Sequence, residues 1–212
     1  MEQILYILPR GLAIGMLISA PMGPIGMLVI QRTLGTGRWQ GFFTGLGAAF
    51  SDLVYCLLTG FCLSFITGFI DRHQLLIQIV GSVVIAAFGY YLLQKNPTRA
   101  LKTAREATTG YWSEFATGFL LTFSNPLILF FIIGLFARFN FFLPEFKVHH
   151  YIVAYLTILG GAVLWWWGIT TLVHRLGKRI NVRSLKIINY VIGLLLMAMA
   201  IVGLGMALYD YL

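Results

Sequence analysis

The stretch Ser19-Ala20-Pro21-Met22-Gly23-Pro24 interrupts an apolar run that extends over residues 11–30. A proline removes a backbone donor and clashes with the carbonyl four residues before it, so we expect a helix to end before Pro21 and to restart at Pro24. A second break, Ser124-Asn125-Pro126, lies at the corresponding place of a later apolar run. Unpaired backbone groups at membrane depth are tolerated only where they line a cavity, so two matching breaks predict a transporter.

Composition indicates the class of protein independently of these breaks. Hydrophobic residues make up 59% of the 212 residues, charged residues 10%, and the mean hydropathy is +0.86. These proportions are typical of an integral membrane protein. The stretches long enough to cross the hydrocarbon layer are 11–30, 41–70, 75–93, 111–137, 151–173 and 186–209. We expect the first to be a retained helix, because Glu2 replaces the positive start of a signal peptide.

The order of the six stretches predicts the architecture. Three spans followed by three more reverse the direction of the chain, so a repeat of this form is inverted. We therefore expect an all-α integral membrane protein with six transmembrane helices in two inverted three-helix repeats, the first and fourth helices being broken. One transporter domain would cover 1–212, with repeat one at about 1–93, a cytoplasmic linker at about 94–110 and repeat two at about 111–212.

The distribution of positive charge predicts the orientation. Of the 15 Lys and Arg residues, eleven lie in the first, third and fifth loops, and only Arg10, Arg72, Arg138 and Lys147 lie on the other side. The positive-inside rule then puts the odd loops in the cytoplasm and both termini outside. The net charge of +8 is split among helix ends and forms no aromatic-and-basic surface, which excludes nucleic-acid binding.

The two breaks supply candidate binding residues. Gly23 and Asn125 suit the N-cap position, which puts Pro24 and Pro126 at the first helical position. Each restarted helix would direct free N–H groups and its positive dipole end into a cavity, as a carboxylate site requires. The alternative is that the prolines only kink two spans for packing. The candidate substrate-binding residues at the breaks are Pro21, Gly23, Pro24, Ile25, Ser124, Asn125 and Pro126.

Asp52 is the carboxylate near the centre of an expected span. An ionised carboxylate in lipid costs about 3 kcal/mol even on the lenient insertion scale, so Asp52 should face protein or water. Its candidate roles are pairing with a substrate ammonium and accepting a coupling proton, and the alternative is a structural hydrogen bond. Tyr55, one step round the helix, is a further binding candidate. The residues expected on the face of Asp52 are Gly41, Gly45, Ala48, Cys56 and Thr59.

Other polar and aromatic residues carry weaker signals. Glu114 begins the fourth span, where a glutamate is usually hydrated and stabilised by the helix dipole. The triplet Trp165 to Trp167 points in three directions, so one ring could face the bundle, with little reason to expect that it binds cargo. No catalytic constellation or phosphate-binding loop is present, so we expect neither an enzyme nor a cofactor or metal site.

Taken together, the segments 19–26, 31–33, 41–52 and 124–126 resemble the LysE/RhtB family of bacterial translocators. The resemblance covers essentially the whole chain, although Met22 separates Pro21 from Gly23 where the family commonly has a compact Pro-Gly-Pro. It implies a secondary transporter of the bacterial inner membrane that exports amino acids or related small metabolites, by exchange with protons or with the membrane potential.

The expected mechanism is proton-coupled alternating access. The cargo carboxylate would lie against the helix starts at 23–25 and 125–127, and its ammonium near Asp52. Two alternatives remain: a divalent or heavy-metal cation exporter, for which only Asp52 and Cys56 could supply ligands at depth, and a non-transporting membrane scaffold. Small-residue faces in the fifth and sixth spans would suit a homodimer or internal packing.

Overall fold

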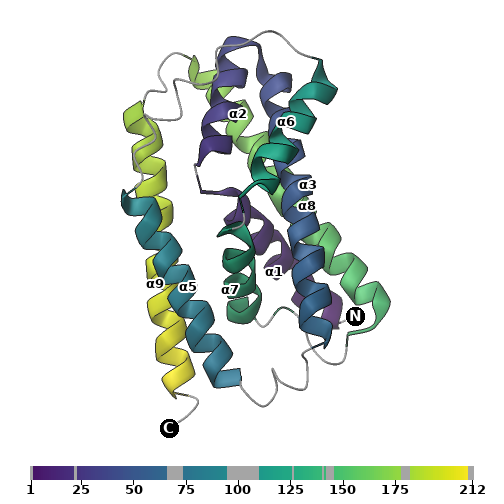
Figure 1. Cartoon of the computed structure of the whole chain (residues 1–212), viewed down its shortest axis with the longest axis vertical. Helices are drawn as coiled ribbons and strands as arrows, with labels where there is room; N and C mark the ends of the chain where they lie inside the picture. The colour runs from purple at the N-terminus through teal and green to yellow at the C-terminus, as the bar shows by residue number, and fades with distance from the viewer. Residues whose placement is uncertain are drawn as a thin grey trace.

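The computed structural model describes the backbone of residues 2–21, 23–65, 74–94, 110–125, 127–139, 141, 146–177 and 182–209. These residues form eight helices and no strand (Figure 1). In chain order the helices are α1 (Glu2–Ser19), α2 (Pro24–Gly35), α3 (Arg38–Phe65), α5 (Gln74–Gln94), α6 (Tyr111–Phe123), α7 (Leu127–Phe139), α8 (Val148–Leu176) and α9 (Val182–Tyr209).

Both expected helix breaks are present. The chain bends by 83° between α1 and α2 and by 77° between α6 and α7. Figure 1 places both breaks near the middle of the long axis, with α2 and α6 above them and α1 and α7 below. The first span begins earlier than residue 11, because α1 starts at Glu2 and includes Pro9. Ile7 in this added part is fully buried, so tertiary packing extends the helix.

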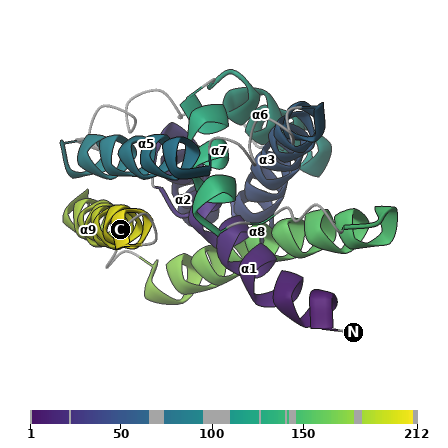
Figure 2. The ribbon, with the colours of Figure 1, turned by 90° about the horizontal axis from the view of Figure 1, so that it is seen from below.

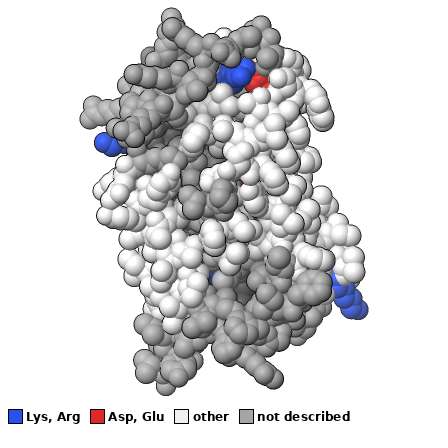
Figure 3. Space-filling view, in the orientation of Figure 1, with Lys and Arg blue, Asp and Glu red and all other residues white. Residues whose placement is uncertain are grey.

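Two of the expected spans, or four if each bent pair counts as one span, have helices of sufficient length and apolarity. Arg38–Phe61 of α3 and Val148–Leu176 of α8 are long and apolar enough to cross a membrane, and each bent pair also qualifies if it is read as one span. The described apolar parts of α5 and α9, Ile79–Tyr91 and Tyr190–Gly205, are shorter. In Figure 3 the few Lys, Arg, Asp and Glu side chains that are coloured on this face lie mainly toward its upper and lower parts, and the described residues between them are mostly uncharged. The described part of the chain is therefore that of a helical membrane protein, while the six-span inverted repeat stays a prediction.

The helices pack in three close pairs, α1 with α8, α3 with α6, and α5 with α9. Figure 2 shows α5 and α9 side by side on one flank, and α7 packs against α5. In the first pair, Gly15 of α1 lies on the backbone of Ile158, and Gly161 of α8 lies on the backbone of Leu12. Any Cβ at either glycine would overlap the partner backbone, so these glycines allow the two helices to approach closely.

The pair α3 and α6 repeats this contact. Gly118 of α6 lies on the backbone of Thr44, and Gly47 of α3 lies on the backbone of Phe115. Each of the four helices carries one of these glycines and one residue on which the partner helix's glycine packs. In every helix the glycine lies three residues after that contact residue. The packing of α6 on α3 thus matches the packing of α1 on α8.

Candidate functional site

Asp52 lies in the middle of α3, on the face that the sequence predicts. The small residues expected beside it are all buried, and Asp52 itself is 3% exposed. The Ser19 hydroxyl at the end of α1 donates to Asp52 Oδ2 over 3.2 Å. Asp52 Oδ1 is buried and has no hydrogen-bond partner among the residues that the structure describes. A buried carboxylate oxygen without a donor is costly, so this atom is a candidate for binding a ligand or a proton.

A cavity of about 190 Å³ opens beside Asp52 at the level of the two breaks. Its walls come from α1, α2, α3, α5, α6, α7 and α8. Apolar side chains such as Ile18, Leu121, Phe88 and Ile128 form much of this surface, and Asp52 is the carboxylate among its described lining residues. A cavity with apolar walls and a few polar groups is the usual form of a small-molecule site.

The structure brings most of the expected binding residues to this cavity. The predicted residues that line it are Pro21, Gly23, Pro24, Ile25, Asp52 and Asn125. At the first break Gly23 caps α2 in an extended conformation and Pro24 occupies the first helical position, as expected. The first N–H groups of α2 therefore lack intrahelical partners at the cavity. Pro126 lies outside the described residues, so the capping role expected of Asn125 stays a prediction.

Tyr55 and Ser124 do not line the cavity. The Tyr55 hydroxyl donates to the Phe123 carbonyl over 2.7 Å, and the two rings stack with centroids 5.3 Å apart. The Ser124 hydroxyl donates to the Leu120 carbonyl over 2.7 Å. Both side chains satisfy carbonyls at the end of α6, so they support the second break and do not contact the cavity.

Two residues for which the sequence gave little or no binding signal also line the cavity, Thr122 and Trp166. They are 5% and 1% exposed, and neither Thr122 Oγ1 nor Trp166 Nε1 has a hydrogen-bond partner among the described residues. Thr122 shares a buried face of α6 with Glu114 and Gly118, and this spacing of four residues was the available sequence signal. For Trp166 the helical geometry indicated one inward ring but could not say which, whereas Trp167 is half-exposed.

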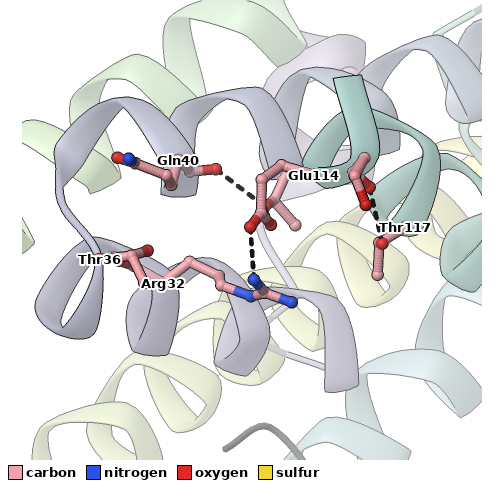
Figure 4. A network of polar contacts seen from close by, with 7 residues as sticks. Arg32, Thr36, Gln40, Glu114 and Thr117 are labelled. Atoms are coloured by element: carbon pink, nitrogen blue, oxygen red, sulfur yellow. Dashed lines mark hydrogen bonds and ion pairs between the residues drawn. The ribbon is translucent and has the colours of Figure 1, made fainter. Parts of the chain in front are cut away.

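Glu114 differs from its expected state, because it is fully buried and not hydrated. Arg32 of α2 forms an ion pair with Glu114 Oε1, and the Thr44 hydroxyl donates to Glu114 Oε2 over 3.0 Å. Figure 4 shows Arg32 reaching toward Glu114, with Thr36 and Gln40 nearby. The expectation was wrong because helices distant in the sequence enclose this helix start. The network joins α2, α3 and α6, and α2 and α6 lie together in the upper part of Figure 1.

The chemistry of the cavity suits a small polar molecule with both charges. Asp52 attracts a cation, and the start of α2 offers N–H donors to an anion. Among the described residues no group of three or more His, Cys, Asp or Glu could hold a metal ion. The fold and this site define a helical membrane protein with two broken helices around a central cavity.

Comparison with known proteins places the chain in a family. The family model described as LysE type translocator matches residues 16–206. The match covers most of the chain, including both breaks and all residues of the cavity. The chain belongs to the LysE-type translocator family, as its sequence motifs indicate.

Individual relatives are distant. The chain is 30% identical over 134 residues to "Putative amino acid efflux protein YcgF" of Bacillus subtilis (strain 168), a match that covers 59% of this chain and 60% of that protein. It is 29% identical over 129 residues to "Uncharacterized membrane protein YahN" of Escherichia coli (strain K12), covering 59% of this chain and 58% of that protein. The chain is 24% identical over 198 residues to "Uncharacterized membrane protein slr1627" of Synechocystis sp. (strain ATCC 27184 / PCC 6803 / Kazusa). This match covers 88% of this chain and 90% of that protein. No solved structure matches the chain.

Proposed function

We propose that this translocator exports amino acids or related small metabolites from the bacterial cytoplasm as a secondary transporter. The observation that carries the proposal is Asp52, a buried carboxylate with one unpaired oxygen in a cavity between two broken helices. Discontinuous helices of this kind supply substrate sites in membrane transporters. The name of the Bacillus subtilis relative, an amino acid efflux protein, supports the class of cargo.

The proposed architecture has six spans in two inverted three-helix repeats within one domain. α1–α2, α3 and α5 would form the first repeat, up to about residue 93, and α6–α7, α8 and α9 the second, from about residue 111. The matching glycine contacts of α1 with α8 and of α6 with α3 support this division. So do the start of α1 and the end of α9, which both lie in the lower part of Figure 1, as an even number of crossings requires.

The proposed binding mode assigns opposite charges of the cargo to opposite parts of the cavity. An amino acid is a zwitterion, and its ammonium would pair with Asp52 while its carboxylate lies against the start of α2 and beside Asn125. Ser19 already holds one Asp52 oxygen, which leaves Oδ1 for the cargo. A charge-assisted hydrogen bond to this buried atom would be stronger than the same bond in water.

In the proposed cycle, the cavity opens alternately to the two sides of the membrane. Protonation of Asp52 from the outside would remove its negative charge, release the ammonium and allow the empty carrier to return. One carboxylate would thus serve both cargo and proton, which cannot occupy it together. Such competition is a direct physical basis for exchange transport.

The test is efflux from proteoliposomes that contain wild-type protein, Asp52→Asn protein or Ser51→Ala protein. Ser51 is the matched control, because it is buried beside Asp52 on α3 and does not line the cavity. A panel of radiolabelled amino acids is loaded, and efflux is followed with and without an imposed proton gradient. We expect gradient-dependent efflux of one class of amino acid from wild-type and Ser51→Ala vesicles, and loss of it in Asp52→Asn vesicles.

Two results would contradict parts of the proposal. If well-folded wild-type protein moved no amino acid, the cargo class would be wrong, and the same vesicles loaded with divalent metal ions would test the cation-export alternative. A protein that moved neither would fit the scaffold alternative. If Asp52→Asn protein kept the wild-type proton dependence, Asp52 would have no coupling role.

A further inference from the structure

Besides Asp52 and Ser19, the cavity is lined by two further residues with buried polar atoms, Thr122 and Trp166. Each residue is more than nine-tenths buried, lines the cavity and carries a polar atom with no hydrogen-bond partner among the described residues. A buried donor that is left unpaired is destabilising, so such atoms are normally satisfied by protein, water or ligand. Two residues that line one cavity and each carry an unpaired hydrogen-bonding group are therefore candidates to donate to a bound ligand.

The packing of α6 relates Thr122 to a residue already placed in the site. Gly15 of α1 and Gly118 of α6 make the same contact with their partner helices. Ser19 follows the first of these glycines by four residues, and Thr122 follows the second by four residues. Thr122 thus occupies in α6 the position that Ser19 occupies in α1, and both line the cavity.

The packing of α8 relates Trp166 to Asp52 in the same way. Gly47 of α3 and Gly161 of α8 are the corresponding glycines. Asp52 follows the first by five residues, and Trp166 follows the second by five residues. The cavity is therefore bounded by two equivalent pairs, Ser19 with Asp52 and Thr122 with Trp166.

The two pairs have opposite hydrogen-bonding character. Asp52, when ionised, only accepts, whereas the indole Nε1 of Trp166 only donates and the Thr122 hydroxyl can donate. A zwitterionic cargo needs both kinds of group. We propose that Trp166 Nε1 and Thr122 Oγ1 donate to the carboxylate of the cargo, together with the start of α2, while Asp52 receives its ammonium. This inference rests on the proposed function and adds two cargo-contacting residues to it.

Trp166 is held in position for this role. Its ring lies on Gly45 of α3, where an added Cβ would come within 2.7 Å of Trp166 Cγ. Val29, Ala48 and Ala162 pack in the same buried cluster. The indole is thus confined before any cargo arrives, so little conformational entropy is lost when its N–H forms a hydrogen bond.

The chain offers a matched control for each residue. Trp165 is the neighbour of Trp166, and its Nε1 is likewise buried without a partner among the described residues, but it does not line the cavity. Thr59 is 2% exposed, has an unpaired Oγ1 and does not line the cavity either. Trp166→Phe is therefore compared with Trp165→Phe, and Thr122→Val with Thr59→Val.

The experiment measures displacement of radiolabelled L-leucine from purified full-length protein by unlabelled L-leucine and by L-leucinamide, which lacks the carboxylate. Leucine suits the apolar walls, and if the efflux panel identifies another amino acid, that amino acid and its amide take its place. We expect Trp166→Phe and Thr122→Val to weaken leucine binding by about tenfold or more, the loss of one charge-assisted hydrogen bond. Binding of leucinamide should change much less, and both controls should bind like the wild type.

The outcomes separate this inference from the proposed function. If Trp166→Phe and Thr122→Val weakened leucine and leucinamide equally, or no more than their controls do, the two side chains would not bind the carboxylate and the inference would be wrong. The efflux assay would still support the proposed function in that case. If wild-type protein moved no amino acid, both would fail together.

Discussion

The two carboxylates that are buried among the described residues differ in how they are satisfied. Glu114 forms an ion pair with Arg32 and accepts a hydrogen bond from Thr44, so its environment is that of a structural group. Asp52 has the Ser19 hydroxyl on one oxygen and a cavity beside the other. Burial alone therefore does not distinguish a carboxylate that holds helices together from one that is available to bind cargo. The hydrogen-bond and ion-pair partners of the carboxylate make this distinction.

The ion pair of Arg32 with Glu114 gives a prediction at the scale of single residues. Removal of one member leaves an uncompensated buried charge, whereas removal of both does not. We expect Arg32→Leu alone to destabilise the protein by about 3–5 kcal/mol and the double variant Arg32→Leu/Glu114→Leu to be clearly more stable than the single variant. Thermal unfolding in detergent, monitored by size-exclusion chromatography, measures the relative stabilities of the wild type, the single variant and the double variant. A double variant that was less stable than Arg32→Leu would show that the pair has no such role.

At the scale of helices, glycines determine which pairs can pack closely. Gly118 of α6 lies on the backbone of Thr44, whereas no atom lies within 4 Å of a Cβ placed on Gly168 of α8. Gly118→Ala should therefore separate α6 from α3 and lower the melting temperature. Gly168→Ala should leave it unchanged or raise it, because alanine is the better helix former by about 1 kcal/mol.

The same two variants carry a functional expectation. Movement of α6 would displace Thr122, which lines the cavity, so Gly118→Ala should also weaken leucine binding. Equal melting temperatures for the two alanine variants would indicate that α6 and α3 can repack without loss, against the close contact in the structure.

For the whole molecule, the distribution of Lys and Arg predicts an orientation with both chain ends outside the cytoplasm. Fusion of alkaline phosphatase or of green fluorescent protein to the C-terminal end tests this in bacterial cells. We expect an active phosphatase, which requires export, and a dark fluorescent protein. Bright fluorescence with an inactive phosphatase would place the C-terminal end inside and reverse the assignment of the loops.

The breaks were predictable because their cause is local. A proline has no backbone N–H to donate to the hydrogen bonds of a helix, wherever it lies in the fold. Pro21 and Pro24 therefore predict the end of α1 and the start of α2. The burial of Asp52 inside the protein was predictable because an ionised carboxylate is costly in lipid, whereas its role in binding stays a proposal. The bounds of α1 were not, since the helix extends back to Glu2 only because residues such as Ile7 find a buried contact.

The sequence by itself determined the membrane class, the broken helices, the family and the burial of Asp52, because each depends on composition or on the chemistry of neighbouring residues. Only the tertiary structure decided which side chains meet. It buried Glu114 against Arg32, turned Tyr55 toward the end of α6 and brought Thr122 and Trp166 to the cavity. These contacts join helices far apart in the chain, and their geometry depends on how closely the helices pack.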